Sequence, residues 1–201
     1  TAEMSAKFPG CRVVGAAETE SWLDALLPIS RYPTLRAQRL TYLHLRKITD
    51  VHAGRSNWRL VLDSDMLFFR RPETLLGWLA APERPVHMVD VHDAYGYPAT
   101  SLAALTKEPV PEKVNVGICG FRSDDIDWDF LEHAAATLIR RHGTSYYLER
   151  ALVALQASTQ NPLRLSEVDY RLMPDEHECR HPTAVLHHYV DLSKRGYFRY
   201  A

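Results

Sequence analysis

The sequence lacks the features that would assign it to a membrane or to a nucleic acid. No apolar run approaches the ~18 residues of a membrane span, and no signal peptide opens the chain. The formal net charge is only −1, so a nucleic acid is not an expected partner. Any affinity for an anionic ligand must therefore come from a local group of cations or from a metal ion.

Cysteine is also scarce. The three cysteines, Cys11, Cys119 and Cys179, lie far apart and form no C-x-x-C pair. This spacing excludes a disulfide framework and a structural zinc site as expectations, and it favours a reducing, cytoplasmic location. The 201 residues are 46% hydrophobic, which is enough for one compact domain with a core, so a single domain is expected over residues 1–201.

Strands and helices are expected to alternate along the chain. Strands are predicted at 11–15, 58–62, 85–91, 114–121 and 185–190, and helices at 34–52, 72–79, 126–142 and 145–158. This alternation predicts an α/β domain with a mainly parallel sheet flanked by helices. Ligands of such sheets bind beyond the carboxyl ends of the strands, where Asp65, Asp90 and Asn115 fall.

The acidic segment Asp63-Ser64-Asp65 follows the apolar run 60–62, which reads as a buried strand. Residues two apart on an extended backbone point the same way, so the two carboxylates should share one side. Two such carboxylates repel unless a cation lies between them, and hard oxygen ligands suit Mg²⁺ or Mn²⁺. The alternative is a strand end whose acids merely cap the next loop.

Two further residues near the C-terminus could complete a metal site. His188 lies in a late apolar strand, and imidazole is a good ligand for Mn²⁺. The adjacent pair His187-His188 should point to opposite faces, so that one side chain is buried while the other reaches the site. Lys194 could place an ammonium against a diphosphate. A satisfied core histidine and a solvated lysine are the alternatives.

Three short segments, in order, resemble the motifs of the family 8, glycogenin-like glycosyltransferases. Segment 60–68 resembles the D-x-D motif and Asn115-Val-Gly117 the N-x-G motif. His188 to Lys194 resembles H-x-G-x-x-K, with Asp191 replacing the glycine. A simple β-bulge or turn is the alternative reading of Asn115-Val-Gly117.

The resemblance implies a GT-A-type, Rossmann-like fold, a UDP-sugar donor and Mn²⁺, with retention of configuration. The metal ligands that it implies are Asp63, Asp65 and His188. Its implied contacts to the donor are Ser64, Asp90, Asn115, Gly117, Lys194 and either Arg36 or Arg39. Among these groups, Asp65, Asn115 and Lys194 are expected to matter for catalysis. Family members begin with a nucleoside-binding strand and helix, and the few residues before Cys11 predict that these N-terminal strands are missing.

The function indicated is transfer of a sugar from a nucleotide-sugar to a glycan, lipid or protein acceptor that the sequence does not identify. An inverting reaction would need a carboxylate near the acceptor, and Asp124, Asp125 and Glu149 are candidates, although such acids are typical of exposed positions beside helices.

Two rival functions remain. One is a haloacid dehalogenase-type phosphohydrolase with Asp63 as nucleophile and Asp65 as acid/base, which would have to draw on Lys113 and the acidic pair Asp124-Asp125. The other is an inactive relative that binds the nucleotide-sugar without turnover.

Overall fold

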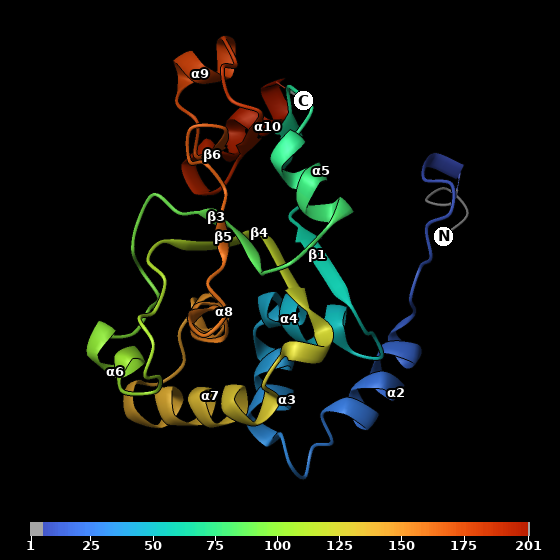
Figure 1. Ribbon diagram of the computed structural model, residues 1–201, viewed down its shortest axis with the longest axis vertical. Coiled ribbons are helices and arrows are strands. Elements are labelled where there is room, and N and C mark those ends of the chain that lie inside the picture. The colour runs from blue at the N-terminus through green and yellow to red at the C-terminus, as the bar shows by residue number, and fades with distance from the viewer. Residues whose placement is uncertain (1–5, 201) are drawn as a thin grey trace.

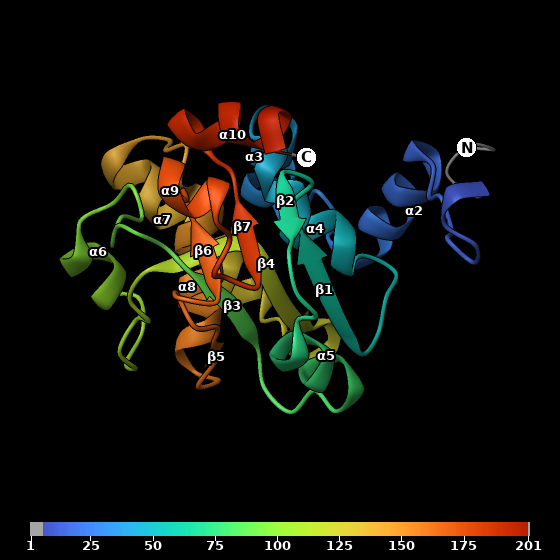
Figure 2. The same ribbon diagram turned by 90° about the horizontal axis from the view of Figure 1, so that it is seen from above.

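The computed structural model describes residues 6–200 and contains two sheets (Figures 1 and 2). The larger sheet has the strand order β1 (Trp58–Leu62), β4 (Val114–Arg122), β3 (Val86–Val89), β5 (Leu163–Arg164). The smaller sheet has the order β2 (Met66–Phe68), β7 (Leu186–His188), β6 (Tyr170–Leu172). The mixed α/β class predicted from the sequence is confirmed.

The prediction of a mainly parallel sheet is wrong. β4 runs antiparallel to both of its neighbours, β1 and β3, and only β5 is parallel to β3. The smaller sheet is also mixed, since β7 is antiparallel to β2 and parallel to β6. β3 is wholly buried and β4 mostly so, since each face of the larger sheet carries a core. A buried apolar run looks the same in a parallel and in an antiparallel strand, so the sequence pattern does not give the strand direction.

One face of the larger sheet is covered by helices, and the main core lies beneath it (Figure 1). The helices on this side are α2 (Ala16–Leu26), α3 (Pro33–Thr41), α4 (Arg46–His52), α7 (Trp128–His142) and α8 (Leu148–Ser158). Of these, α4 packs on β1 and α8 on β4, and the other three pack on helices. Asp127 caps the N-terminus of the long helix α7, because its carboxylate accepts a hydrogen bond from Phe130 N at 2.9 Å. α8 packs directly against β4, and Glu149 in its first turn lines a small cavity with Cys119 of that strand.

The opposite face carries a second, smaller core formed with α5 (Glu73–Ala80) and the smaller sheet. Leu75 and Trp78 of α5 pack there with Met88, Ile118 and Leu186. The remaining helices are short: α6 (Ala99–Ala103), α9 (Glu176–Arg180) and α10 (Lys194–Tyr200). In Figure 1, α9 and α10 lie beside β6, away from the large helices.

Two predicted elements differ in the structure. The helix expected over residues 34–52 is broken at Tyr42, whose extended backbone is followed by a 3₁₀ turn, Leu43–Leu45. Leu40 and Leu43 are more than 60% exposed, so the apolar residues of this segment do not form one helical face. Residues 11–15 form no strand, and within the described part of the chain β1 is the first strand.

Among residues 6–200, no helix is long and apolar enough to cross a membrane.

Candidate metal centre

The acidic segment is the link by which the chain passes from one sheet to the other. The backbone N–H of Asp63 donates to Gly117 O at 2.8 Å, which extends the pairing of β1 with β4. The carbonyl of Asp65 accepts from Tyr189 N at 2.9 Å, which extends the pairing of β2 with β7. Ser64 lies between them and is exposed. Each carboxylate is therefore carried on backbone that a sheet holds in place.

The two carboxylates converge on His188, the last residue of β7. His188 Nε2 lies 3.2 Å from Asp65 Oδ1 and 3.6 Å from Asp63 Oδ2. One ligand atom from each of the three residues lies within 4.8 Å of the others, a grouping that could hold a metal ion. Two carboxylate oxygens and one imidazole nitrogen are ligands that a divalent cation accepts.

His188 has the chemical state that a metal ligand requires. Its side chain is 2% exposed, and neither ring nitrogen has a hydrogen-bond partner. Nε2 is near Asp65 but is not in hydrogen-bonding geometry with it, although the distance alone would allow a bond. Burial lowers the pKa of His188, while Asp63 and Asp65 oppose that shift, so the ring is neutral and its lone pair is available. An orphaned buried imidazole beside two carboxylates fits a bound cation.

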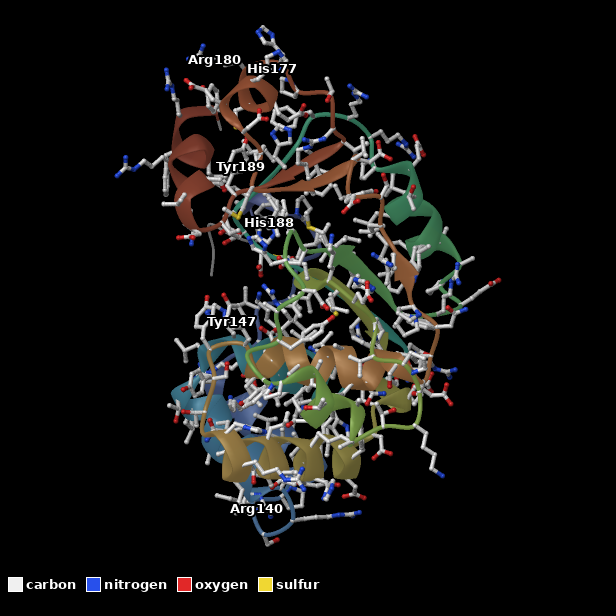
Figure 3. The ribbon with its side chains drawn as sticks, turned by 90° about the vertical axis from the view of Figure 1, so that its left-hand side faces the viewer. Arg140, Tyr147, His177, Arg180, His188 and Tyr189 are labelled. Atoms are coloured by element: carbon white, nitrogen blue, oxygen red, sulfur yellow. The ribbon has the colours of Figure 1, made fainter. Side chains whose placement is uncertain are left out.

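The neighbouring His187 has the opposite role. It is fully buried, with Nε2 at 2.9 Å from Glu178 Oε1 and Nδ1 at 3.0 Å from the Tyr189 hydroxyl. The two histidines thus face different surroundings, as alternation along a strand requires. Figure 3 labels His188 and Tyr189, which lie in the upper half of that view.

The segment Asn115-Val-Gly117 shapes the space beside His188. The pairing of β4 with β3 is irregular here, because the adjacent residues His87 and Met88 lie opposite Cys119 and Asn115. Within this irregular stretch, Asn115 Oδ1 accepts a hydrogen bond from Gly117 N at 2.9 Å. The register shift skips residues 116–118 of β4, so it is larger than a simple β-bulge, and both Asn115 and Gly117 line the same pocket as the acidic cluster.

Two lysines neutralise the carboxylates. Lys47 Nζ lies 2.6 Å from Asp63 Oδ1, and Lys194 Nζ lies 3.5 Å from Asp65 Oδ2. Lys194 was predicted to lie here, but Lys47, on α4, was not. Asp191, at the position of the motif glycine, has a positive φ of 47°, a conformation that glycine adopts readily and aspartate tolerates.

Arg36 and Arg39, expected to approach the donor, do not lie at this site. Both are on α3 and form ion pairs within the helical layer: Arg36 with Asp24 at 2.8 Å, and Arg39 with Glu20 at 2.7 Å. Arg39 also binds Asp50 of α4 through two bonds. Because the chain breaks at Tyr42, α3 and α4 are separate helices, and their basic residues do not share one face. Of the predicted basic side, Lys47 reaches the acidic cluster, whereas Arg36 and Arg39 do not.

Asp90 follows β3 and is 4% exposed. Its carboxylate accepts hydrogen bonds from Asn115 Nδ2 at 2.7 Å and from His92 N at 3.0 Å, and it pairs with Arg150 at 2.8 Å. Arg150 comes from α8 and was not anticipated. Asp90 is thus the anchor of a buried polar network that fixes Asn115.

These groups line one large pocket of about 900 Å³. Asp63, Asp65 and His188 lie on its lining together with Asp90, Asn115 and Gly117. Figure 3 shows His188 above and Tyr147, just before α8, below the intervening space. His44, Tyr146 and Tyr147 add an aromatic part to the lining, with the Tyr146 ring centroid 5.2 Å from that of His44 and 5.3 Å from that of Tyr147.

Of the three carboxylates considered for an inverting reaction, the structure places one at the pocket and two away from it. Asp124 accepts a hydrogen bond from Asn57 N at 2.9 Å, next to the start of β1, whereas Asp63 follows the end of that strand. Asp125 lies in the same 3₁₀ turn, Ser123–Asp125, and is exposed. Lys113 does not line the pocket, and its backbone N–H bonds to Asp93. Glu149 alone of the three proposed carboxylates lies on the pocket lining, and it is buried rather than exposed.

No family model, curated protein or solved structure matches the chain.

Proposed function

We propose that this chain is a metal-dependent glycosyltransferase that moves a sugar from a UDP-sugar to an acceptor hydroxyl. Asp63, Asp65 and His188 would hold Mn²⁺ or Mg²⁺. The observation that carries the proposal is the buried, unpartnered imidazole of His188 beside two carboxylates, at the edge of a pocket of about 900 Å³. A pocket of this size is large enough for a nucleotide-sugar.

The chemistry divides between the leaving group and the sugar. A bound divalent cation would supply Lewis-acid stabilisation of the departing diphosphate. Lys47 and Lys194 hold ammonium groups against Asp63 and Asp65, where they can turn to neutralise phosphate oxygens. Asn115, fixed by Asp90, offers an amide to sugar hydroxyls. The rings of His44, Tyr146 and Tyr147 offer apolar faces to a sugar or a base.

Under this proposal, the fold is a variant of the GT-A type, with the acidic segment after β1, an edge strand of the larger sheet. The segments that resemble D-x-D, N-x-G and H…K line one pocket, although His188 lies 125 positions after Asp63 in the chain. By contrast, no observation favours a haloacid dehalogenase-type hydrolase, because Lys113 and Asp124 lie away from Asp63. The hydrolase is therefore not proposed.

Calorimetric titration of UDP with and without Mn²⁺ tests the metal site. The expected result is UDP binding that requires Mn²⁺ and is lost in Asp65→Asn and in His188→Ala. His133→Ala, which removes an exposed histidine of α7, serves as the matched control and should bind like the parent. Unchanged UDP–Mn²⁺ affinity in Asp65→Asn would refute the site.

Turnover is tested separately. Release of UDP from a panel of UDP-sugars with Mn²⁺ is expected for an active transferase, with water as acceptor where no other is present. Metal-dependent UDP binding without release from any UDP-sugar would identify the chain as an inactive relative. Phosphate release from generic phosphomonoesters would instead support the hydrolase.

A further inference from the structure

Glu149 is a buried carboxylate in the first turn of α8. Its side chain is 5% exposed, and it lies on the lining of the large pocket together with Asn115, Gly117 and Arg150. This burial is unusual, because an acidic side chain in the first turn of a helix is usually exposed to solvent. Glu149 also lines a small cavity together with Cys119 of β4.

The carboxylate of Glu149 has no hydrogen-bond or ion-pair partner within residues 6–200, which sets it apart from other buried acids of this chain. Asp90 is bound by Arg150, Asn115 and the backbone of His92. Glu178 is bound by Thr183, Ala184 and His187. The ammonium of Lys47, the cation that acts most strongly on Glu149, forms its ion pair with Asp63.

A carboxylate in this position is unfavourable in the protein without ligand. Burial raises the pKa of Glu149 to about 8, the charge of Asp63 adds to that shift, and Lys47 and Arg150 oppose it without cancelling it. The N-terminus of α8 offers only part of the missing stabilisation. A positive charge arriving in the pocket would remove the penalty, because an opposite charge nearby favours the ionised form.

We infer that Glu149 is a catalytic residue whose carboxylate stabilises the positive charge that develops on the sugar during transfer. This inference rests on the proposed function. Asp124 and Asp125, the two other carboxylates considered as a base for an inverting reaction, do not line the pocket, because they belong to the turn near the start of β1.

The step balances as follows for a sugar and an acceptor alcohol. The bond between the anomeric carbon and the diphosphate oxygen breaks, and its electron pair leaves with the diphosphate. The sugar ring carries positive charge, and the ionised Glu149 faces it. The acceptor oxygen then bonds to the anomeric carbon, and its proton passes to an oxygen of the released diphosphate. Glu149 is unchanged at the end.

Binding of a charged sugar analogue tests the inference without turnover. In the presence of UDP and Mn²⁺, the parent should bind 1-deoxynojirimycin, a protonated iminosugar, more tightly than the neutral 1-deoxyglucose. Glu149→Gln, which keeps the shape and removes the charge, should abolish that preference while leaving the UDP–Mn²⁺ affinity within about twofold. Asp125→Asn removes an exposed carboxylate and is the matched control. An undiminished preference in Glu149→Gln would overturn the inference.

Rates provide the second measurement. For UDP-sugar hydrolysis, kcat of Glu149→Gln should fall by about 100-fold or more, as when one group that stabilises transition-state charge is removed. Glu149→Asp, which keeps the charge, should retain more activity than Glu149→Gln. If Glu149→Gln had the same kcat as the parent, or if its kcat and its UDP affinity fell by the same factor, the role of Glu149 would be overturned. Neither result would bear on the proposed function. Absence of both UDP–Mn²⁺ binding and turnover in the parent would instead overturn the proposed function.

Should Glu149→Gln not fold, as judged by its melting temperature, Glu149→Ala with added formate replaces it. Recovery of hydrolysis with formate would support the inference, because the small anion restores the missing negative charge. A folded Glu149→Ala with parental turnover would contradict it.

Discussion

The imidazole of His188 lies directly over the α-carbon of Gly117. A Cβ atom at Gly117 would be 2.2 Å from His188 Cε1 and 2.6 Å from Nδ1, closer than real Cβ atoms approach other heavy atoms. The glycine of the N-x-G segment is thus needed for space, since its φ is not in the left-handed region. His188 can reach Asp63 and Asp65 only because residue 117 has no side chain.

We therefore expect Gly117→Ala to displace His188 and weaken Mn²⁺ binding by about 10- to 100-fold, the range seen when a group that orients a metal ligand is lost. Calorimetric titration with Mn²⁺ and UDP measures the change. Gly77→Ala is the control, because a Cβ atom there meets nothing within 4 Å and the helical site should gain about 0.5–1 kcal/mol of stability. Parental Mn²⁺ affinity in Gly117→Ala would show that the glycine does not set the position of His188.

Lys47 competes with a cation for Asp63. Its ammonium lies 2.6 Å from Asp63 Oδ1, and both side chains are 23% exposed. Lys47→Gln should therefore tighten binding of Mn²⁺ alone several-fold, by roughly 0.5–1 kcal/mol, yet weaken binding of UDP–Mn²⁺, where a cation is needed against the diphosphate. Lys194→Gln is the internal comparison: that ammonium is 3.5 Å from Asp65 and 59% exposed, so its effect on Mn²⁺ alone should be smaller. Weaker binding of Mn²⁺ alone in Lys47→Gln would contradict this competition.

Arg150 holds the buried Asp90 through an ion pair of 2.8 Å, with side-chain exposures of 15% and 5%. Arg150→Met leaves a buried carboxylate without its cation, so the free energy of unfolding should fall by about 3–5 kcal/mol. Urea denaturation measures the loss. Arg122→Met is the control, since its pair with Asp124 is about half exposed and should contribute less than about 1 kcal/mol. Equal losses for the two variants would show that burial of Asp90 carries no special penalty.

The acidic cluster and most of the helices and strands from residue 58 onward can be predicted from the sequence, because their signals are local. The apolar run before Asp63 predicts β1, and the alternation of side chains predicts that Asp63 and Asp65 share one side. The direction of the strands has no such signal. Whether a strand runs parallel or antiparallel depends on its neighbours, and β4 lies between β1 and β3, antiparallel to both. Packing on both faces of the sheet decides that arrangement.

The positions of the basic side chains near the site also have no local signal. Periodicity assigned Arg36 and Arg39 to the basic side of one long helix, but the break at Tyr42 separates that side into two. Arg36 and Arg39 pair with acids of α2 and α4, whereas Lys47 turns toward Asp63. Glu149 was read as an exposed helical residue, since nothing local shows that α8 lies under β4. Contacts between distant segments decide these positions.

Glu178 provides a pH-dependent test of the scaffold that carries β7. Its carboxylate accepts hydrogen bonds from Thr183 N and Ala184 N at 2.8 Å each, and it meets His187 Nε2 at 2.9 Å. Burial by itself raises the pKa of this carboxyl, but the hydrogen bonds from Thr183, His187 and Ala184 outweigh burial and lower the pKa to about 2. The usual value is 4.5, so the folded state favours the ionised form.

The sign of the effect follows from linkage. A carboxyl with a lowered pKa in the folded state stabilises the protein fully above its unfolded pKa of 4.5, and that stabilisation disappears as the pH falls toward 2. Glu178→Gln should lower the free energy of unfolding by about 2 kcal/mol at neutral pH, and the gap to the parent should close in acid. Urea denaturation across this pH range measures the gap. Glu176→Gln, which alters an exposed carboxylate of the same helix, should follow the parent throughout. A gap that stays constant from neutral pH to acid would show that the ionised form of Glu178 does not hold the segment before β7.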